Sequence, residues 1–233
     1  MKNPNYDAFI FDLGRVLVDF DHHISARKIA TLVHQSASAP ERRITEEWLY
    51  QLFFESDIIN AFDEGKVSPR KFYSEMKKLT GIKISYSEFV PLWADIFSEK
   101  KEMAELVSCL KKDYRLVLMS NVNVLQFERI RKNFSVVSEF DELVLSYEVG
   151  AMKPDPKIYE AAIKATNTAP DRIIYTDDRQ ELIDGGIKAG IKASFVFTDL
   201  EQFKSDLKSI GVKINDNICH CEERSDKAIS LLK

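Results

Sequence analysis

The sequence predicts an α/β protein in which a mostly parallel sheet is covered by helices and interrupted by a helical insertion. After Glu99, helical segments alternate with short runs that are apolar enough to be buried on both faces, as strands of a parallel sheet are. Between His22 and Phe97, apolar residues recur at three-to-four spacing over several successive segments, which is the helical period. These two patterns divide the chain into a core and an insertion.

The first strand is predicted over residues 8–11 and ends at Asp12, ahead of a turn that carries Gly14. An ionised carboxylate at the end of a buried strand is costly unless it has a use. Open α/β sheets bind ligands in the crevice outside the carboxyl ends of their strands. We therefore interpret Asp12 as a nucleophile.

The insertion follows, and no strand is expected in it. Serine caps the first turn of a helix well, so Ser68 before Pro69, and Ser85 three residues before Glu88, indicate helix starts. Helices are predicted over 24–35, 41–57, 68–81 and 85–97. The aromatic residues of this region fall at helical spacings and are expected to pack as its core: Trp48, Phe53, Phe54, Phe72, Phe89 and Trp93.

The rest of the chain returns to alternation, with strands predicted over 115–120, 142–146, 172–176 and 193–197. Crossover connections between parallel strands are nearly always right-handed, so the carboxyl ends of these strands should meet at one edge. We expect the following residues to gather there: Asp12, Ser120, Ser146, Thr176, Asp177 and Asp178. Past Phe203 the pattern fades into a polar segment.

Composition narrows the class of protein. The chain has 233 residues, 33 basic against 37 acidic, which gives no broad electrostatic footprint for nucleic acid. No apolar run approaches the roughly 20 residues that cross a bilayer, and the start lacks a signal-peptide core. With only three cysteines, we expect a cytoplasmic protein that has no membrane or nucleic-acid partner. The oligomeric state is left open, and Cys219-His220-Cys221 lacks the spacing of a closed zinc site.

The residues predicted at the sheet edge suit phosphoryl transfer. Asp12, Asp177 and Asp178 together make a hard-oxygen site of the kind that Mg²⁺ prefers. Lys153, in a rigid Lys-Pro-Asp-Pro turn, could screen charge between nucleophile and substrate. Ser120 lies at the start of the next predicted helix, where backbone N–H groups such as that of Asn121 can cradle an anion. Positioning and charge neutralisation supply most of the catalysis in phosphoryl transfer.

Four segments resemble, in order, the motifs of the haloacid dehalogenase-like hydrolase superfamily: FDLGRV, LMSNVN, AMKPDP and YTDDRQELIDGG. The resemblance extends over about residues 6–199. It implies a Rossmann-like three-layer α/β/α core and a helical cap of the C1 type inserted after the first strand. On this basis we predict a core of residues 1–21 and 98–205, a cap of 22–97 and a polar C-terminal tail of 206–233.

The resemblance also implies a role for each site residue. Asp12 would form an aspartyl-phosphate, Ser120 would hydrogen-bond the phosphoryl group, and Lys153 would hold the nucleophile and the phosphate together. The pair Asp177-Asp178 would supply Mg²⁺ ligands, with Asp178 as the better direct ligand. Gly14 would offer its backbone carbonyl to the metal.

Two positions depart from the family pattern. Gly14 stands where phosphatases of the superfamily usually have an aspartate that acts as general acid and base. Leu182 stands where the fourth motif normally has Asn or Asp, and Asp184 is the nearest possible substitute. Surrogate acids could come from the segment after the loop, which contains Asp19, Asp21, His22 and His23.

The Asp-Leu-Gly-x-Val form is similar to a subgroup of sugar-phosphate phosphatases that includes the bacterial glucose-1-phosphate phosphatases. An anomeric hydroxyl is a better leaving group than an ordinary alcohol, so a site without the second aspartate has a physical rationale. The first hypothesis is therefore a Mg²⁺-dependent phosphatase of a small phosphorylated metabolite. The alternatives are a metal-independent 2-haloacid dehalogenase, and a degenerate member that binds a phosphorylated ligand or a protein without turnover.

Overall fold

The first predicted strand lies in the middle of the sheet. The structure is a computed structural model that describes residues 3–35 and 44–214. Its main sheet has five strands in the order β5-β4-β1-β6-β7, and every pairing between them is parallel. The strands are β1 (Ala8–Phe11), β4 (Arg115–Ser120), β5 (Glu142–Leu145), β6 (Ile173–Asp177) and β7 (Ala193–Val196). The prediction of a mostly parallel α/β sheet is confirmed.

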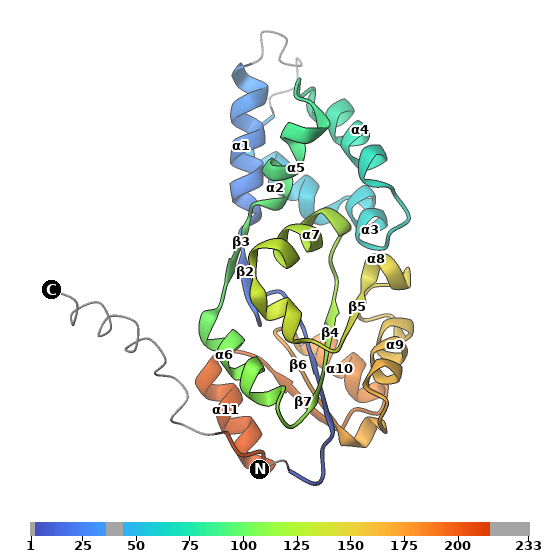
Figure 1. The fold of residues 1–233 in the computed structure, drawn as a ribbon. Coiled ribbons are helices and arrows are strands. Elements are labelled where there is room, and N and C mark those ends of the chain that lie inside the picture. The colour runs from blue at the N-terminus through green and yellow to red at the C-terminus, as the bar shows by residue number, and fades with distance from the viewer. Residues whose placement is uncertain (1–2, 36–43, 215–233) are drawn as a thin grey trace, which may run out of the picture.

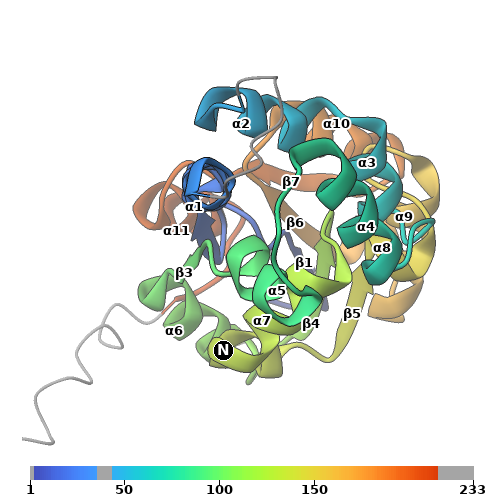
Figure 2. The same ribbon diagram turned by 90° about the horizontal axis from the view of Figure 1, so that it is seen from above.

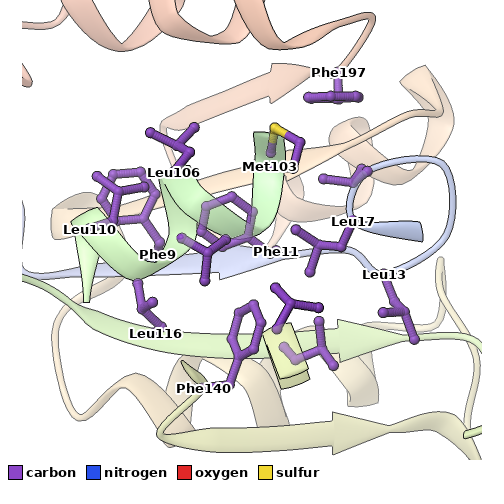
Figure 3. Close-up of a cluster of buried hydrophobic side chains, with 14 of the residues drawn as sticks. Phe9, Phe11, Leu13, Leu17, Met103, Leu106, Leu110, Leu116, Phe140 and Phe197 are labelled. Carbon is purple, nitrogen blue, oxygen red and sulfur yellow. The ribbon is translucent and has the colours of Figure 1, made fainter. Parts of the chain in front are cut away.

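Helices cover both faces of this sheet, because successive residues of a strand point to opposite faces. Phe9 and Phe11 of β1 belong to one apolar cluster, which Figure 3 shows, and Ile10 belongs to a second cluster. The first cluster is covered by α6 (Lys101–Leu110), α7 (Val124–Asn133) and α11 (Leu200–Ser209). The second is covered by α9 (Pro156–Thr166) and α10 (Gln180–Lys188). Figures 1 and 2 show α6 and α11 on one side of the sheet, and α9 and α10 on the other.

The insertion forms its own apolar cluster, with Phe72, Phe89 and Trp93 fully buried in it. Its helices gather at one end of the molecule (Figure 1): α1 (His22–Gln35), α2 (Glu46–Glu55), α3 (Asp57–Asp63), α4 (Pro69–Thr80) and α5 (Tyr86–Ala94). Ser68 caps α4 by accepting from the Lys71 N–H, and Ser85 forms a capping box with Glu88, as the sequence predicts. The side chains of Phe53 and Phe54 lie outside what the structure describes.

Some elements escaped the sequence prediction. β2 (Val18–Phe20) and β3 (Phe97–Glu99) pair antiparallel where the chain enters and leaves the insertion, and β3 begins where no strand was expected. The helix predicted over 41–57 is two helices, which meet at Ser56. α11 continues past residue 205 to Ser209. The remaining short turns are η1 (Ser135–Glu139), α8 (Ser146–Val149) and η2 (Pro170–Arg172).

The lengths of the helices and the extent of the described residues bear on the predictions for membranes and for the C-terminal tail. Across residues 3–35 and 44–214, every helix is too short or too polar to cross a membrane. The segment Cys219-His220-Cys221 lies outside the described residues.

Candidate active site

The carboxyl ends of the central strands bring together the residues that the sequence singled out. Asp12 directly follows β1, Ser120 is the last residue of β4, and Asp177 is the last residue of β6. Lys153 reaches the same point from the segment between α8 and α9. Carboxylate oxygens of Asp12, Asp177 and Asp178 all lie within 4.8 Å of one another.

Lys153 is the centre of this arrangement. Its Nζ donates to Asp12 Oδ1 at 2.6 Å and to Asp177 Oδ2 at 2.5 Å, and its side chain is only 1% exposed. The Asn121 side chain fixes the lysine backbone from both sides, because Oδ1 accepts from the Lys153 N–H and Nδ2 donates to its carbonyl. Tyr175 lies two residues before Asp177, on the same face of β6, and its hydroxyl donates to Asp177 Oδ2 at 2.7 Å.

Burial and charge act against each other in this cluster. Burial raises the pKa of Asp12 to about 7, and the Lys153 ammonium opposes that rise. Burial and the neighbouring Asp177 carboxylate also raise the pKa of Asp178. For Lys153, the carboxylates of Asp12 and Asp177 outweigh burial and raise the pKa above its ordinary value. Lys153 is therefore a permanent cation among three carboxylates, which leaves the cluster with net negative charge.

The three carboxylates differ in how many of their oxygens are already used. Both oxygens of Asp177 accept hydrogen bonds, Oδ2 from Lys153 and Tyr175 and Oδ1 from the Arg179 N–H at 3.2 Å. Asp178 is half-buried, and its carboxylate bonds its own backbone N–H but no other residue of 3–35 and 44–214. Hard oxygen donors with an excess of negative charge are the donor set that suits Mg²⁺. The residues present thus fit the predicted cation.

A cavity of about 350 Å³ opens beside these carboxylates, between the core and the insertion. The core contributes the predicted phosphate-binding residues Ser120, Asn121 and Lys153, together with Gly14. The insertion contributes Trp93 of α5, one of the aromatic residues expected in its core, and Asn60 and Asp63 of α3, which sequence reasoning missed. Helical periodicity shows that these helices are amphipathic, but it does not show which residues turn toward the core.

The departure at Gly14 has a steric explanation. A Cβ atom at this position would lie 2.9 Å from Cε1 of the Phe20 ring, closer than ordinary contact allows. The Arg15 guanidinium lies over the same ring, 4.3 Å from its centre. Phe20 therefore occupies the space into which a side chain at position 14 would grow, a relation that sequence reasoning missed.

The departure at Leu182 is a packing feature. Leu182 is buried in α10, and its carbonyl accepts from the Tyr159 hydroxyl at 2.8 Å. Asp184 is exposed and accepts from Gln180 on its own helix, so the structure does not bring it to the carboxylate cluster.

Only one of the four surrogate acids lines the cavity. Asp19 lies near Arg15 and Lys100, Asp21 accepts from the His23 N–H, and His23 contacts Glu46. His22 lines the cavity, where burial lowers its pKa to about 4. Its imidazole is therefore neutral near pH 7.

The sequence and the fold of this chain are similar to those of known proteins. Residues 9–196 match the family model of the haloacid dehalogenase-like hydrolases. The chain is 24% identical to a D-ribitol-5-phosphate phosphatase of Bacteroides thetaiotaomicron, over 78% of this chain and 88% of the relative. It is 27% identical to a glyceraldehyde 3-phosphate phosphatase of Methanothermobacter thermautotrophicus, over 93% and 98%. A crystal structure of a family enzyme from Bacteroides thetaiotaomicron, in complex with magnesium and inorganic phosphate, superposes with a TM-score of 0.72 at 21% identity, covering 85% of this chain and 98% of that one.

Proposed function

The chain belongs to the haloacid dehalogenase-like hydrolases, and we propose that it is a Mg²⁺-dependent phosphatase of a small phosphorylated metabolite. The observation that carries the proposal is the buried Lys153, which bridges Asp12 and Asp177 beside Asp178, at the edge of a cavity. Two relatives are named as phosphatases of small carbohydrate phosphates, and a family enzyme from Bacteroides thetaiotaomicron was crystallised with magnesium and inorganic phosphate. Sugar and polyol phosphates, glucose 1-phosphate included, are the substrate class we infer.

The proposed reaction consists of two successive displacements at phosphorus. A carboxylate oxygen of Asp12 attacks phosphorus, the bond from phosphorus to the leaving-group oxygen breaks, and an aspartyl-phosphate forms. The departing oxygen takes its proton from water. Water then attacks this phosphorus, releases inorganic phosphate and restores the carboxylate. Lys153 holds Asp12 in place and neutralises charge on the phosphoryl oxygens, and Ser120 with the Asn121 N–H orients the phosphoryl group.

The proposed metal ligands are Asp12, Asp178 and the Gly14 carbonyl. Asp177 is the remaining carboxylate of the cluster, and we assign it chiefly to holding Lys153, because both its oxygens already accept hydrogen bonds. Mg²⁺, when bound, supplies positive charge against the phosphoryl oxygens and the nucleophile.

Removal of the divalent cation tests the proposal. We expect chelation to lower phosphatase activity by about 10²-fold or more, because three carboxylates against one ammonium would repel the phosphate dianion. Addition of Mg²⁺ should restore the activity. The measurement is phosphate release from a panel of sugar and polyol phosphates before and after chelation.

Other outcomes of the same assay identify the alternatives. Halide release from 2-chloropropionate by the chelated protein would identify a dehalogenase. Retention of vanadate with Mg²⁺, without turnover of any phosphomonoester, would identify a binding protein. Either result contradicts the proposed phosphatase.

The contact between Gly14 and Phe20 gives a second prediction. Gly14→Asp alone is expected to leave kcat unchanged or lower, because the new side chain meets the Phe20 ring. Combined with Phe20→Ala, the same change should raise kcat for an alkyl phosphate by about 10-fold or more, since a general acid contributes roughly 10²–10⁴-fold when well placed. Phe20→Ala by itself is the control. An equal gain from the single and the double variant would show that Phe20 does not exclude the acid.

A further inference from the structure

A second polar cluster lines the same cavity, formed by Asp63 of the insertion and by Asn123 and Gln126 of the core. We propose that Asp63 and Gln126 form a subsite for a substrate hydroxyl group, which donates to Asp63 Oδ2 and accepts from Gln126 Nε2. The proposal rests on the proposed phosphatase function, and it names the contacts by which the protein would select a phosphorylated polyol or sugar.

Asn123 orients both members of the subsite and has no capacity left for a ligand. Its Oδ1 accepts from the Gln126 N–H at 3.1 Å and from Trp93 Nε1 at 3.4 Å. Its Nδ2 donates to Asp63 Oδ1 at 2.9 Å and to Gln126 Oε1 at 2.8 Å. All hydrogen-bonding positions of the Asn123 amide are therefore used. Asn123 is a positioning residue.

These bonds decide which polar atom of Gln126, a residue that lines the cavity, is left without a partner. Because Gln126 Oε1 accepts from Asn123, the amide orientation is fixed and Nε2 is the atom left over. Gln126 is 6% exposed, and its Nε2 has no hydrogen-bond partner within the described residues. A buried donor without a partner destabilises a folded protein unless a ligand or water satisfies it. The orphaned amide thus indicates an acceptor on the molecule that fills the cavity.

Asp63 supplies the complementary acceptor. Its Oδ1 is held by Asn123, and its Oδ2 accepts no hydrogen bond from residues 3–35 or 44–214. Burial raises the pKa of Asp63 to about 6, so the group is still mostly ionised at pH 7 and above. A negative carboxylate repels a phosphate group, and this wall of the cavity therefore suits the uncharged part of the substrate.

A hydroxyl group matches the pair because it donates one hydrogen bond and accepts others. An alkyl chain would leave both Gln126 Nε2 and Asp63 Oδ2 desolvated and unpaired, and sites built to bond a hydroxyl reject analogues that lack it. The Ser146 hydroxyl also donates to the Asp63 carbonyl at 2.6 Å, which fixes the end of α3 against the core. The subsite is thus held by both parts of the chain.

The test compares D-ribitol 5-phosphate with n-pentyl phosphate, which have the same chain length and the same primary-alcohol leaving group. We expect Asp63→Asn to lower kcat/KM for ribitol 5-phosphate by about 10- to 100-fold, mainly through KM, because the loss is that of one charge-assisted hydrogen bond. The value for pentyl phosphate should change by less than about 2-fold. Gln126→Met should give the same selective loss, of about 10-fold. Asp57→Asn, on the exposed start of the same helix, is the matched control.

Each other outcome contradicts the subsite. Equal losses for both substrates would mean that the cluster only joins the insertion to the core. Equal hydrolysis of both substrates by the wild-type protein would mean that no hydroxyl is recognised. If Asp63→Asn does not fold, Gln126→Met decides between these results. If the wild-type protein hydrolyses neither substrate nor any other phosphomonoester with Mg²⁺, the proposed function itself falls, and the subsite with it.

Discussion

Lys153→Met is expected to lower the free energy of unfolding by about 3–5 kcal/mol and to abolish turnover. The substitution removes a cation that both Asp12 and Asp177 contact, and a buried charge left without its partner costs about this much. For a chain of this size the melting temperature should fall by roughly 10 °C. Thermal unfolding in metal-free buffer measures the effect. The exposed Lys157, four residues later, provides the control variant Lys157→Met, which should melt as the wild type does.

The loss in Lys153→Met should depend on pH in a definite direction. Without the ammonium, the pKa of Asp12 rises further, because Lys153 is the group that opposes the effect of burial. Protonation of the carboxyl groups then removes the unpaired buried charge. The free energy of unfolding of the variant should therefore be closer to that of the wild type at pH 5 than at pH 8. A destabilisation that stays constant between these pH values would show that lost packing, not unpaired charge, is its cause.

Asp12→Asn is expected to lower kcat by on the order of 10⁴-fold or more, since the reaction loses its nucleophile. Phosphate release in the presence of Mg²⁺ measures it, and incorporation of phosphate into the protein should disappear as well. An equal kcat in the variant and the wild type would contradict covalent catalysis at this position.

The same substitution should not destabilise the metal-free protein at high pH. The pKa of Asp12 in the folded state is about 7, above its ordinary value of 3.8. A group whose pKa is raised on folding stabilises the protein below its unfolded pKa, and that contribution is lost as the pH rises through the folded pKa. The asparagine side chain does not titrate, so the variant should be at least as stable as the wild type at pH 8. A lower melting temperature at pH 8 than the wild type would mean that the ion pair with Lys153 outweighs burial.

The parts of the fold that the sequence predicted are those in which one short segment carries its own signal. β1, β4 and β6 are continuous apolar runs because they are buried on both faces, and they were identified to within a residue or two. Ser68 and Ser85 marked helix starts because a cap acts on its own helix.

The features that were missed depend on segments far apart in the chain. Phe97–Glu99 is too short for its sequence pattern to predict a strand, and it forms one by pairing with β2. The sequence shows that Asp177 and Asp178 are adjacent. It does not show that Lys153 and Tyr175 would hydrogen-bond to Asp177. The contact of Asp63 with Asn123 depends on how the insertion sits on the core.

The central place of β1 has a consequence for the order of assembly during synthesis. β1 leaves the ribosome before the other four strands of its sheet, yet its partners are Arg115–Leu118 on one side and Ile173–Thr176 on the other. More than a hundred residues must be made before the first of these ladders can form, whereas the helices of the insertion contact one another locally. The strand that leads into Asp12 therefore stays unpaired for much of translation, and the last of its two ladders closes only after Thr176 has emerged.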